Sequence, residues 1–424
     1  MSSAILQQLR RPTAILVLAN FVSLGLGLVS AALQARLLGP EGRGELATAM
    51  VPAGMAAMLL CIGLPDYFAR QAAKGKDLGR LSLTAGILGF GVGAVAVLPY
   101  IWIAGLLAPP GSSAWSLLIA YAVLTPVTTF GYCLMSIAVG AGYWKTVSIA
   151  KLAPQITAVV GLLFLSLPGA SPATVGALLI GSTLLGLILP LARKVFWPFG
   201  RIKKSYFGAA LSFGLRGWPS GAIALLNQRI DLLLLTAIAS KEQLGFYAVA
   251  TTLAAVLTTV SNSVAMPTRN RVAQGEIHIV PSTTAATMAV TFVLAIGVVL
   301  ALPILVTLIL GPDFLPAIPI MTVLLAAQLP LSGIVVMTQS LVGAGRPSLP
   351  FYGEVSALLV TATIVLILVP VAGPIWAAWA NLAGNLVSFV TLLFLCRRHL
   401  RSGPTWRYLF ISPKRILAIM KGSS

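Results

Sequence analysis

The sequence predicts an all-α polytopic membrane protein, on the grounds of its composition and the length of its apolar runs. Of its 424 residues, 58% are hydrophobic and 9% are charged, whereas about 25% of the residues in soluble domains are charged. The mean hydropathy is +0.97. The apolar residues form long runs, and a helix needs about 20 such residues to cross a bilayer. We therefore expect membrane-spanning helices along most of the chain.

Twelve apolar segments can be distinguished, and each predicts one transmembrane helix. The first follows Arg10 and Arg11 and continues without a convincing cleavage site, so we expect it to be retained and not removed as a signal peptide. The connections are short, which leaves no room for a sizeable domain outside the membrane. The approximate limits of the segments are residues 13–37, 46–69, 81–107, 114–139, 145–167, 172–192, 207–238, 244–267, 284–310, 315–341, 349–370 and 373–396.

Basic residues are distributed very unequally among the connections. The net charge is +19, which in a soluble protein would suggest nucleic-acid binding. Here the basic residues cluster in the short connections between spans, and successive connections lie on opposite sides of the membrane. The connections on one side, together with the N-terminus and the tail, carry 23 Lys and Arg residues, while those on the other side carry three. By the positive-inside rule both termini are cytoplasmic, and no nucleic-acid partner is expected. The three exceptions are Arg36, Arg43 and Lys241, of which Arg43 is interpreted as a loop charge.

Residue types that carry most enzyme chemistry are scarce. Three Cys and two His residues are present without metal-ligand spacing, and no paired carboxylates or nucleotide-binding motif are found. The stretches Val139–Gly142 and Val342–Gly345 lack the lysine and the strand of a phosphate-binding loop, and fit tight helix ends instead. We therefore expect no enzyme, no cofactor and no metal site, and a protein driven by an ion gradient or the membrane potential.

The chain repeats itself at a nearly constant interval. The four matches are Gly44–Ala49 with Gly245–Ala250 at an offset of 201 residues, Pro65 with Pro267 at 202, and Pro109 with Pro312 and Val139–Gly142 with Val342–Gly345, both at 203. Each match alone is weak, because Gly and Ala are abundant. Their common order and near-constant offset predict that the chain contains two equivalent halves.

The repeat predicts a two-lobed membrane protein. The expected domains are an N-terminal six-helix lobe at 1–200, a C-terminal six-helix lobe at 201–396 and a basic cytoplasmic tail at 397–424. Six spans per half give both halves the same orientation, and transporters built in this way bind at the lobe interface and rock one lobe against the other. The tail is either an interfacial helix on the anionic inner leaflet or a positive-inside anchor.

The seventh segment, within residues 207–237, carries Arg216, Arg229 and Asp231. A charge near the bilayer centre costs about 2.5–3.5 kcal/mol on insertion scales, so such residues usually face a protein interior or a wet cavity. On a straight helix, Arg216, Asn227 and Asp231 fall within about 60° of one another, while Arg229 points to the opposite side. This polar stripe is typical of the wall of a path through the membrane.

The first segment, which the repeat makes equivalent to the seventh, also carries polar residues. Asn20 and Gln34 are 14 residues apart and share one face of a helix to within about 40°. Arg36 follows near the outer end of the segment. The repeat places these residues opposite the stripe on the seventh segment.

Two stretches give the chain a resemblance to a known family. Leu37-Leu-Gly-Pro-Glu-Gly-Arg-Gly44 after the first span, and Asp231 followed by Lys241-Glu-Gln and Gly245-Phe-Tyr-Ala-Val-Ala250, resemble the oligosaccharide flippases, also called polysaccharide biosynthesis proteins. This family lies in the multidrug/oligosaccharidyl-lipid/polysaccharide superfamily, with the fold of the MATE transporters. The resemblance implies transport of a polyprenyl-diphosphate-linked oligosaccharide, by alternating access, to the outer leaflet of the bacterial cytoplasmic (inner) membrane.

The implied cargo assigns roles to the polar residues in the spans. Arginine offers a planar fork of donors that suits phosphate oxygens. The candidate substrate-binding residues are Arg216, Arg36, Arg229, Asn20, Gln34, Asn227, Gln228 and Trp218, the last suited to stacking on a sugar face. The resemblance also implies membrane lipids and glycan polymerase machinery as partners, and two lobes in one chain need no second copy to form a pathway. The product is O-antigen of lipopolysaccharide, capsule or exopolysaccharide.

Each candidate has a structural alternative. Arg216 either binds diphosphate or pairs with Asp231 or Asp66, and Arg229 binds, pairs or snorkels outward. Arg36 is either a site residue or an interfacial anchor. The coupling candidates are Asp231, Asp66 and Glu354. Asp231 either takes up and releases a proton or forms a static ion pair, and the other two either couple transport or cap helices and pair with basic connections.

Two other function classes compete with the flippase. A drug or metabolite exporter of the same fold would favour acidic or aromatic side chains for cationic cargo, whereas the spans here hold three arginines and one central carboxylate. A membrane-bound glycan polymerase or ligase would need large outer connections, which are absent from the sequence pattern. Lipid-linked oligosaccharide transport is therefore the leading hypothesis, with the exporter as the alternative.

Overall fold

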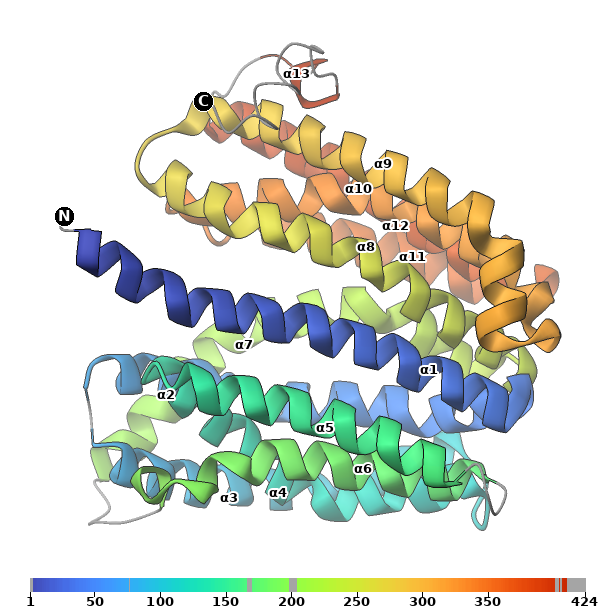
Figure 1. Ribbon diagram of the computed structural model, residues 1–424, viewed down its shortest axis with the longest axis horizontal. Helices are drawn as coiled ribbons and strands as arrows, with labels where there is room; N and C mark the ends of the chain where they lie inside the picture. The colour runs from blue at the N-terminus through green and yellow to red at the C-terminus, as the bar shows by residue number, and fades with distance from the viewer. Residues whose placement is uncertain are drawn as a thin grey trace. The chain divides into compact units, whose positions relative to one another are not determined.

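The computed structural model is helical throughout its described part (Figure 1). It describes residues 3–75, 77–165, 170–197, 204–400, 404 and 406–409, and within these ranges the side chains of 3–18, 57, 58, 204–206, 216, 217, 219 and 220 are not described. The chain forms two compact units, Met1–Leu225 and Leu226–Ser424. The lobe boundary at residue 200 stays a prediction.

The described part of the first unit contains six α-helices and two short 3₁₀ helices before α7. They are α1 (Ser3–Leu60), α2 (Leu64–Ala73), α3 (Leu78–Leu107), α4 (Ser113–Gly140), α5 (Trp144–Leu165), α6 (Pro172–Ile188) and the short 3₁₀ helices η1 (Leu189–Ala192) and η2 (Lys194–Phe196). Helix α7 (Lys204–Ile238) begins in this unit and ends in the second.

The second unit repeats the pattern of long helices. Its elements after α7 are α8 (Lys241–Ala273), η3 (Ile277–Ile279), α9 (Val280–Leu305), η4 (Val306–Leu310), η5 (Pro312–Ala317), α10 (Ile318–Gly343), α11 (Pro350–Ala372), α12 (Ile375–Leu400) and α13 (Trp406–Leu409). Eleven helical stretches of the described chain are long and apolar enough to cross a membrane, and one of them, Ala19–Ala56, covers the first predicted span and part of the second. The predicted fold class is confirmed.

The first two predicted spans are joined without a loop. Gly39 has φ 64° and ψ −177°, and α1 is two helices that meet at this residue (Figure 1). Only glycine reaches this combination of φ and ψ without a Cβ clash, and Pro40 disfavours a helical conformation in the residue before it. Arg43 follows within the second part of α1, so its interpretation as a loop charge is wrong. The chain turns here by a kink between two helices.

The second predicted span, 46–69, is interrupted near its C-terminal end. Helix α1 stops at Leu60 and α2 begins at Leu64. The indole Nε1 of Trp218, on the first part of α7, donates a hydrogen bond of 2.7 Å to the carbonyl of Leu59. Carbonyls in the last turn of a helix lack partners within the helix. The carbonyl of Leu59 also accepts the backbone amide of Ile62 at 3.3 Å, so Trp218 adds a second and shorter bond at this helix end.

Helices α4 and α10 end in the same way, at the two Val-Gly-Ala-Gly stretches. Gly142 and Gly345 have φ 75° and 77°, the left-handed conformation that commonly follows a helix. The amide of the next residue bonds to a carbonyl five residues back, as in a Schellman motif. These bonds are Tyr143 N to Ala138 O at 3.0 Å and Arg346 N to Leu341 O at 2.9 Å. The prediction that both stretches form tight helix ends is confirmed.

The first glycine of each stretch permits a close helix contact. A Cβ at Gly140 would overlap the carbonyl of Ala69 on α2, and one at Gly343 would overlap the carbonyl of Arg269 on α8. The neighbours of the two helices also match, because α4 contacts α1, α2, α3 and α6 while α10 contacts α8, α9 and α12. Each unit therefore packs around one central helix with equivalent partners.

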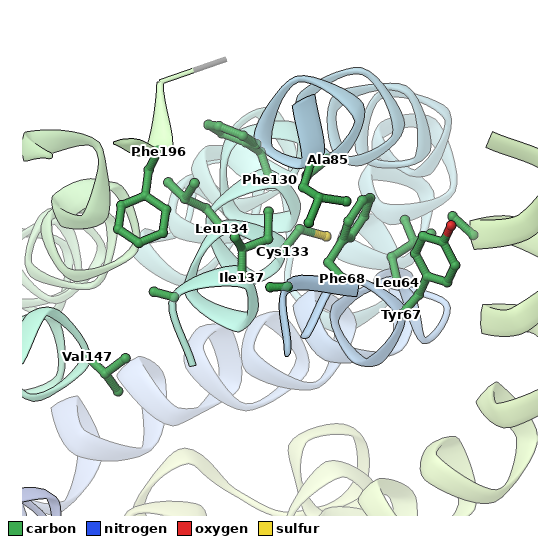
Figure 2. Packing of buried hydrophobic residues seen from close by; sticks show 14 residues of the cluster. Leu64, Tyr67, Phe68, Ala85, Phe130, Cys133, Leu134, Ile137, Val147 and Phe196 are labelled. Carbon is green, nitrogen blue, oxygen red and sulfur yellow. The ribbon is translucent and has the colours of Figure 1, made fainter. Parts of the chain in front are cut away.

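Buried apolar side chains surround these central helices. In the first unit, Figure 2 shows Phe68 of α2, Ala85 of α3 and Leu134 of α4 in one cluster, with Phe196 of η2 beside it. In the second unit, a cluster from α8, α9, α10 and α12 includes Tyr408 of α13, which is fully buried. The beginning of the tail is therefore anchored to the second unit by an aromatic side chain.

Alanine at Gly140 or Gly343 is expected to destabilise the protein. Overpacking of this kind costs about 1–3 kcal/mol, and the overlapping atom in each case is a backbone oxygen that cannot rotate away. The measurement is the apparent Tm of the purified protein in detergent. Gly91→Ala and Gly297→Ala are matched controls in α3 and α9, since a Cβ there meets nothing within 4 Å. Equal Tm values in all four variants would contradict the packing described here.

Candidate functional site

Asp231 is a buried carboxylate in α7, with 2% of its surface exposed. Its Oδ2 accepts hydrogen bonds from the hydroxyl of Tyr247 on α8 at 2.5 Å and from Nδ2 of Asn381 on α12 at 2.9 Å. Its Oδ1 accepts the backbone amide of Leu232 at 2.7 Å. Three donors from three helices thus hold one carboxylate in the second unit.

The polar network continues along α12. Asn385 donates through Nδ2 to Oδ1 of Asn381 at 3.0 Å and lies 3.3 Å from the carbonyl of Ala327 on α10. The network links α7, α8, α10 and α12. Sequence reasoning missed Tyr247, Asn381 and Asn385. The available signal was the pair of asparagines four residues apart in an apolar span, since residues at that spacing share a helix face.

One turn before Asp231, Asn227 donates through Nδ2 to Oε2 of Glu354 on α11 at 2.6 Å. Glu354 is half-buried. The structure therefore brings together two residues that the sequence assigned to separate roles, a sugar ligand and a coupling carboxylate. Gln228 and Arg229, next in the chain, are exposed. Asn227 and Asp231 both point to partners within the second unit.

The other α7 candidates lie in the first unit. The helix includes Arg216, but the side chain of this residue lies outside the described part of the structure. Its role and its possible pairing with a carboxylate stay predictions. Trp218 is 38% exposed while its Nε1 is held by Leu59. The indole ring is thus fixed at one edge with part of its surface open.

Gln34 is buried in α1 and bridges the kink at Gly39. Its Nε2 donates to Oγ of Ser30 at 2.9 Å, and its Oε1 accepts a bond of 2.6 Å from Nη1 of Arg43. The Nε of Arg43 is buried and has no hydrogen-bond partner. Arg43 was absent from the predicted site because the sequence placed it in a loop. Arg36, also predicted, is exposed.

Asn20 lies on the part of α1 before the kink and faces α5. Its Oδ1 accepts a hydrogen bond of 2.5 Å from Nζ of Lys151. Lys151 is one of the 23 basic residues counted above for the connections expected in the cytoplasm, although it lies within the predicted span 145–167, and its contact with Asn20 was missed. Asp66, a coupling candidate, is exposed in the first turn of α2, where the helix dipole favours a carboxylate.

The arrangement suits the binding of polar and anionic groups more than metal coordination. Among the described residues, no group of three or more His, Cys, Asp or Glu side chains could hold a metal ion. Arg43, Lys151, Asp231 and Glu354 each have an amide side chain as a hydrogen-bond partner, and an amide leaves their charge in place. Such charges within membrane helices usually mark a transport pathway or a relay.

Comparison with known families identifies the chain. The profile described as "Polysaccharide biosynthesis protein" matches residues 9–269. The chain belongs to this family. A search of curated protein sequences gave no match.

Solved structures of similar fold are membrane transporters. The lipid II flippase MurJ, in an inward closed conformation, has a TM-score of 0.76 at 15% identity, covering 96% of this chain and 92% of its own. An inward-facing multidrug resistance MATE transporter of the MOP superfamily has a TM-score of 0.69 at 16% identity, covering 95% and 96%. The eukaryotic MATE transporter AtDTX14 has a TM-score of 0.64 at 13% identity, covering 96% and 99%. The chain therefore has the fold of these transporters.

Removing the carboxylate of Asp231 is expected to destabilise the second unit. Asp231→Ala leaves the Tyr247 hydroxyl and the Asn381 amide without their acceptor, and an unsatisfied buried donor costs about 1–3 kcal/mol. Tyr247→Phe removes one of the same bonds, so Asp231→Ala combined with Tyr247→Phe should cost less than the sum of the single changes. The apparent Tm of the three variants measures this coupling, and strictly additive losses would contradict it.

Proposed function

We propose that this protein is a flippase that translocates a polyprenyl-diphosphate-linked oligosaccharide across the bacterial cytoplasmic membrane by alternating access. Its product would be a surface polysaccharide such as O-antigen, capsule or exopolysaccharide. Family membership supports this proposal, as does a fold shared with a lipid II flippase. The proposed orientation has both termini in the cytoplasm, where 23 of the basic residues would lie.

The observation that carries the proposal is that two cations within the spans have neutral hydrogen-bond partners. Arg43 and Lys151 are held by the amide oxygens of Gln34 and Asn20, and neither makes an ion pair with a carboxylate of the described chain. An amide satisfies a hydrogen bond but leaves the positive charge uncompensated. An anionic head group supplies the missing charge, whereas a cationic drug would be repelled. This observation favours diphosphate cargo over the drug exporter.

We also propose Asp231 as the coupling carboxylate. Among the carboxylates of the described residues, Asp231 alone is buried, whereas Asp66 is exposed and Glu354 is half-buried. One of the two partners of the Oδ2 of Asp231 is the hydroxyl of Tyr247, which can donate to the carboxylate and accept from the carboxylic acid. Both protonation states therefore have a partner at this position, as a proton-coupled transporter requires.

Deleting the gene in its host is expected to cause a complete lipid-linked oligosaccharide to accumulate. Restoring the wild type should clear it, and Arg216→Ala should fail to do so, because loss of a charge-assisted contact worth about 1.5–3 kcal/mol reduces binding about tenfold or more. Mass spectrometry of the lipid extract measures this. Arg271→Ala, which removes an arginine in the last turn of α8 that is paired with Glu276, is the control and should clear the lipid.

The same experiment separates the competing functions. No accumulation in the deletion strain, with surface glycan unchanged, would contradict the flippase and favour the exporter. Accumulation that Arg216→Ala clears as fast as the wild type would retain the function and remove Arg216 from the site.

Asp231→Asn is expected to abolish acceleration of transport by an imposed pH gradient. Asparagine retains an acceptor oxygen for Tyr247 but cannot take up or release a proton. The measurement is transport of a fluorescent lipid-linked sugar in proteoliposomes, with and without the gradient. Asp66→Asn, at an exposed carboxylate, is the control and should keep the wild-type response. A response retained by Asp231→Asn would show that Asp231 has only a structural role.

A further inference from the structure

Lys151 is a charged side chain inside a helix that can cross the membrane. Helix α5 spans Trp144–Leu165, and Lys151 lies seven residues after its start, which corresponds to about 10 Å along the axis. The side chain is exposed. A lysine at such a depth is costly unless its ammonium reaches water or a partner. The groups around Lys151 therefore show how a charge at this depth is stabilised.

The partner of Lys151 is neutral. Its Nζ donates a hydrogen bond of 2.5 Å to Oδ1 of Asn20 on α1. The four carboxylates of the first unit are Glu41, Glu45, Asp66 and Asp77, and within the described structure none of them forms an ion pair with Lys151. An ammonium has three donors, so two remain for another acceptor. The positive charge of Lys151 is thus not neutralised, and two of its three N–H donors can bond to another acceptor.

Other amide groups continue the polar surface on the same pair of helices. Gln155 follows Lys151 by four residues, so the two share a face of α5. Gly27 of α1 faces it, since a Cβ at Gly27 would lie 3.8 Å from Oε1 of Gln155. Asn20 and Gly27 are two turns apart on α1. The contact between α1 and α5 thus contains one cation and two amides within a short distance.

We propose that Lys151 and Asn20 form a binding site for the phosphate oxygens of a prenyl diphosphate. Lys151 supplies the charge and the Nδ2 of Asn20 supplies a second donor. Lysine carries a compact charge on a flexible stem, so the ammonium can follow an anion while staying near Asn20. This inference rests on the proposed function, and extends it by assigning the diphosphate to residues on α1 and α5.

The test is binding of farnesyl diphosphate to the purified full-length protein in nanodiscs. Farnesol has the same chain without charge, and inorganic pyrophosphate has the charge without the chain. Lys151→Gln is expected to raise the Kd for farnesyl diphosphate about tenfold or more, since a hydrogen bond to a charged group is lost. Lys151→Arg should restore most of the affinity. Lys145→Gln, on the same exposed helix start, is the matched control and should bind as the wild type does.

A second variant tests the charge without removing the lysine. Asn20→Asp places a carboxylate at the hydrogen-bond distance that Lys151 now has to an amide, and this would neutralise the site. Its affinity for farnesyl diphosphate should fall as far as that of Lys151→Gln, while an apparent Tm at or above the wild-type value shows that the fold is intact. Farnesol binding should be the same in every variant, because farnesol has no charge. Inorganic pyrophosphate should rank the variants in the same order of affinity as farnesyl diphosphate does, because the site binds the phosphate oxygens.

Three results would overturn the inference. They are no binding of farnesyl diphosphate to the wild type, an equal Kd for Lys151→Gln and Lys145→Gln, or an unchanged Kd for Asn20→Asp. These outcomes are independent of the lipid-linked oligosaccharide that accumulates in a deletion strain. If that lipid accumulates and Lys151 has no effect on binding, the flippase stands and this site fails. If Lys151 controls binding and no lipid accumulates, the site stands with a different prenyl diphosphate as cargo.

Discussion

The constraint on which this structure depends is that a backbone group within a bilayer needs a partner inside the protein. At Gly39 the chain changes direction without a loop, because Pro40 has no amide hydrogen to satisfy. Where α1 stops, the indole of Trp218 takes the carbonyl of Leu59. Schellman bonds close α4 and α10. At these four points the helices turn or end with their polar groups bonded within the protein.

The same constraint applies to charged side chains, and several of them have the amide of an Asn or Gln side chain as a hydrogen-bond partner. Four such pairs have bonds shorter than 3.0 Å, namely Lys151 with Asn20, Arg43 with Gln34, Asp231 with Asn381, and Glu354 with Asn227, and Arg269 with Gln339 forms a longer one of 3.5 Å. An oppositely charged partner would cancel the charge and fix it as a structural ion pair. An amide gives a hydrogen bond and leaves the charge available to a ligand or a proton. This choice of partner distinguishes side chains suited to transport from side chains that only hold helices together.

Sequence patterns predicted the spans, the two helix-ending glycine stretches and the unusual carboxylate at Asp231, because these depend on composition and local backbone chemistry. The kink at Gly39 was mistaken for a connection, since glycine followed by proline also marks a loop. Lys151 was counted with the basic connections although it lies within the predicted span 145–167, so its charge inside the span was overlooked. The partners Tyr247 and Asn381 depend on which helices meet, and no periodicity within a single helix encodes that contact.

The repeat explains how one scaffold accommodates two kinds of chemistry. The glycines that set the contacts of α4 and α10 recur in both halves, so the backbone packing is shared. The charged residues with amide partners differ between the units. Asp231 and Glu354, the carboxylates described above, lie in the second unit, whereas the cations Lys151 and Arg43 lie in the first and a further cation, Arg269, lies 3.5 Å from the amide oxygen of Gln339 in the second. Packing that depends on small residues leaves other helix positions free to change. Function can therefore diverge between equivalent halves while the fold is kept, with anion binding expected from the first unit and proton coupling from the second.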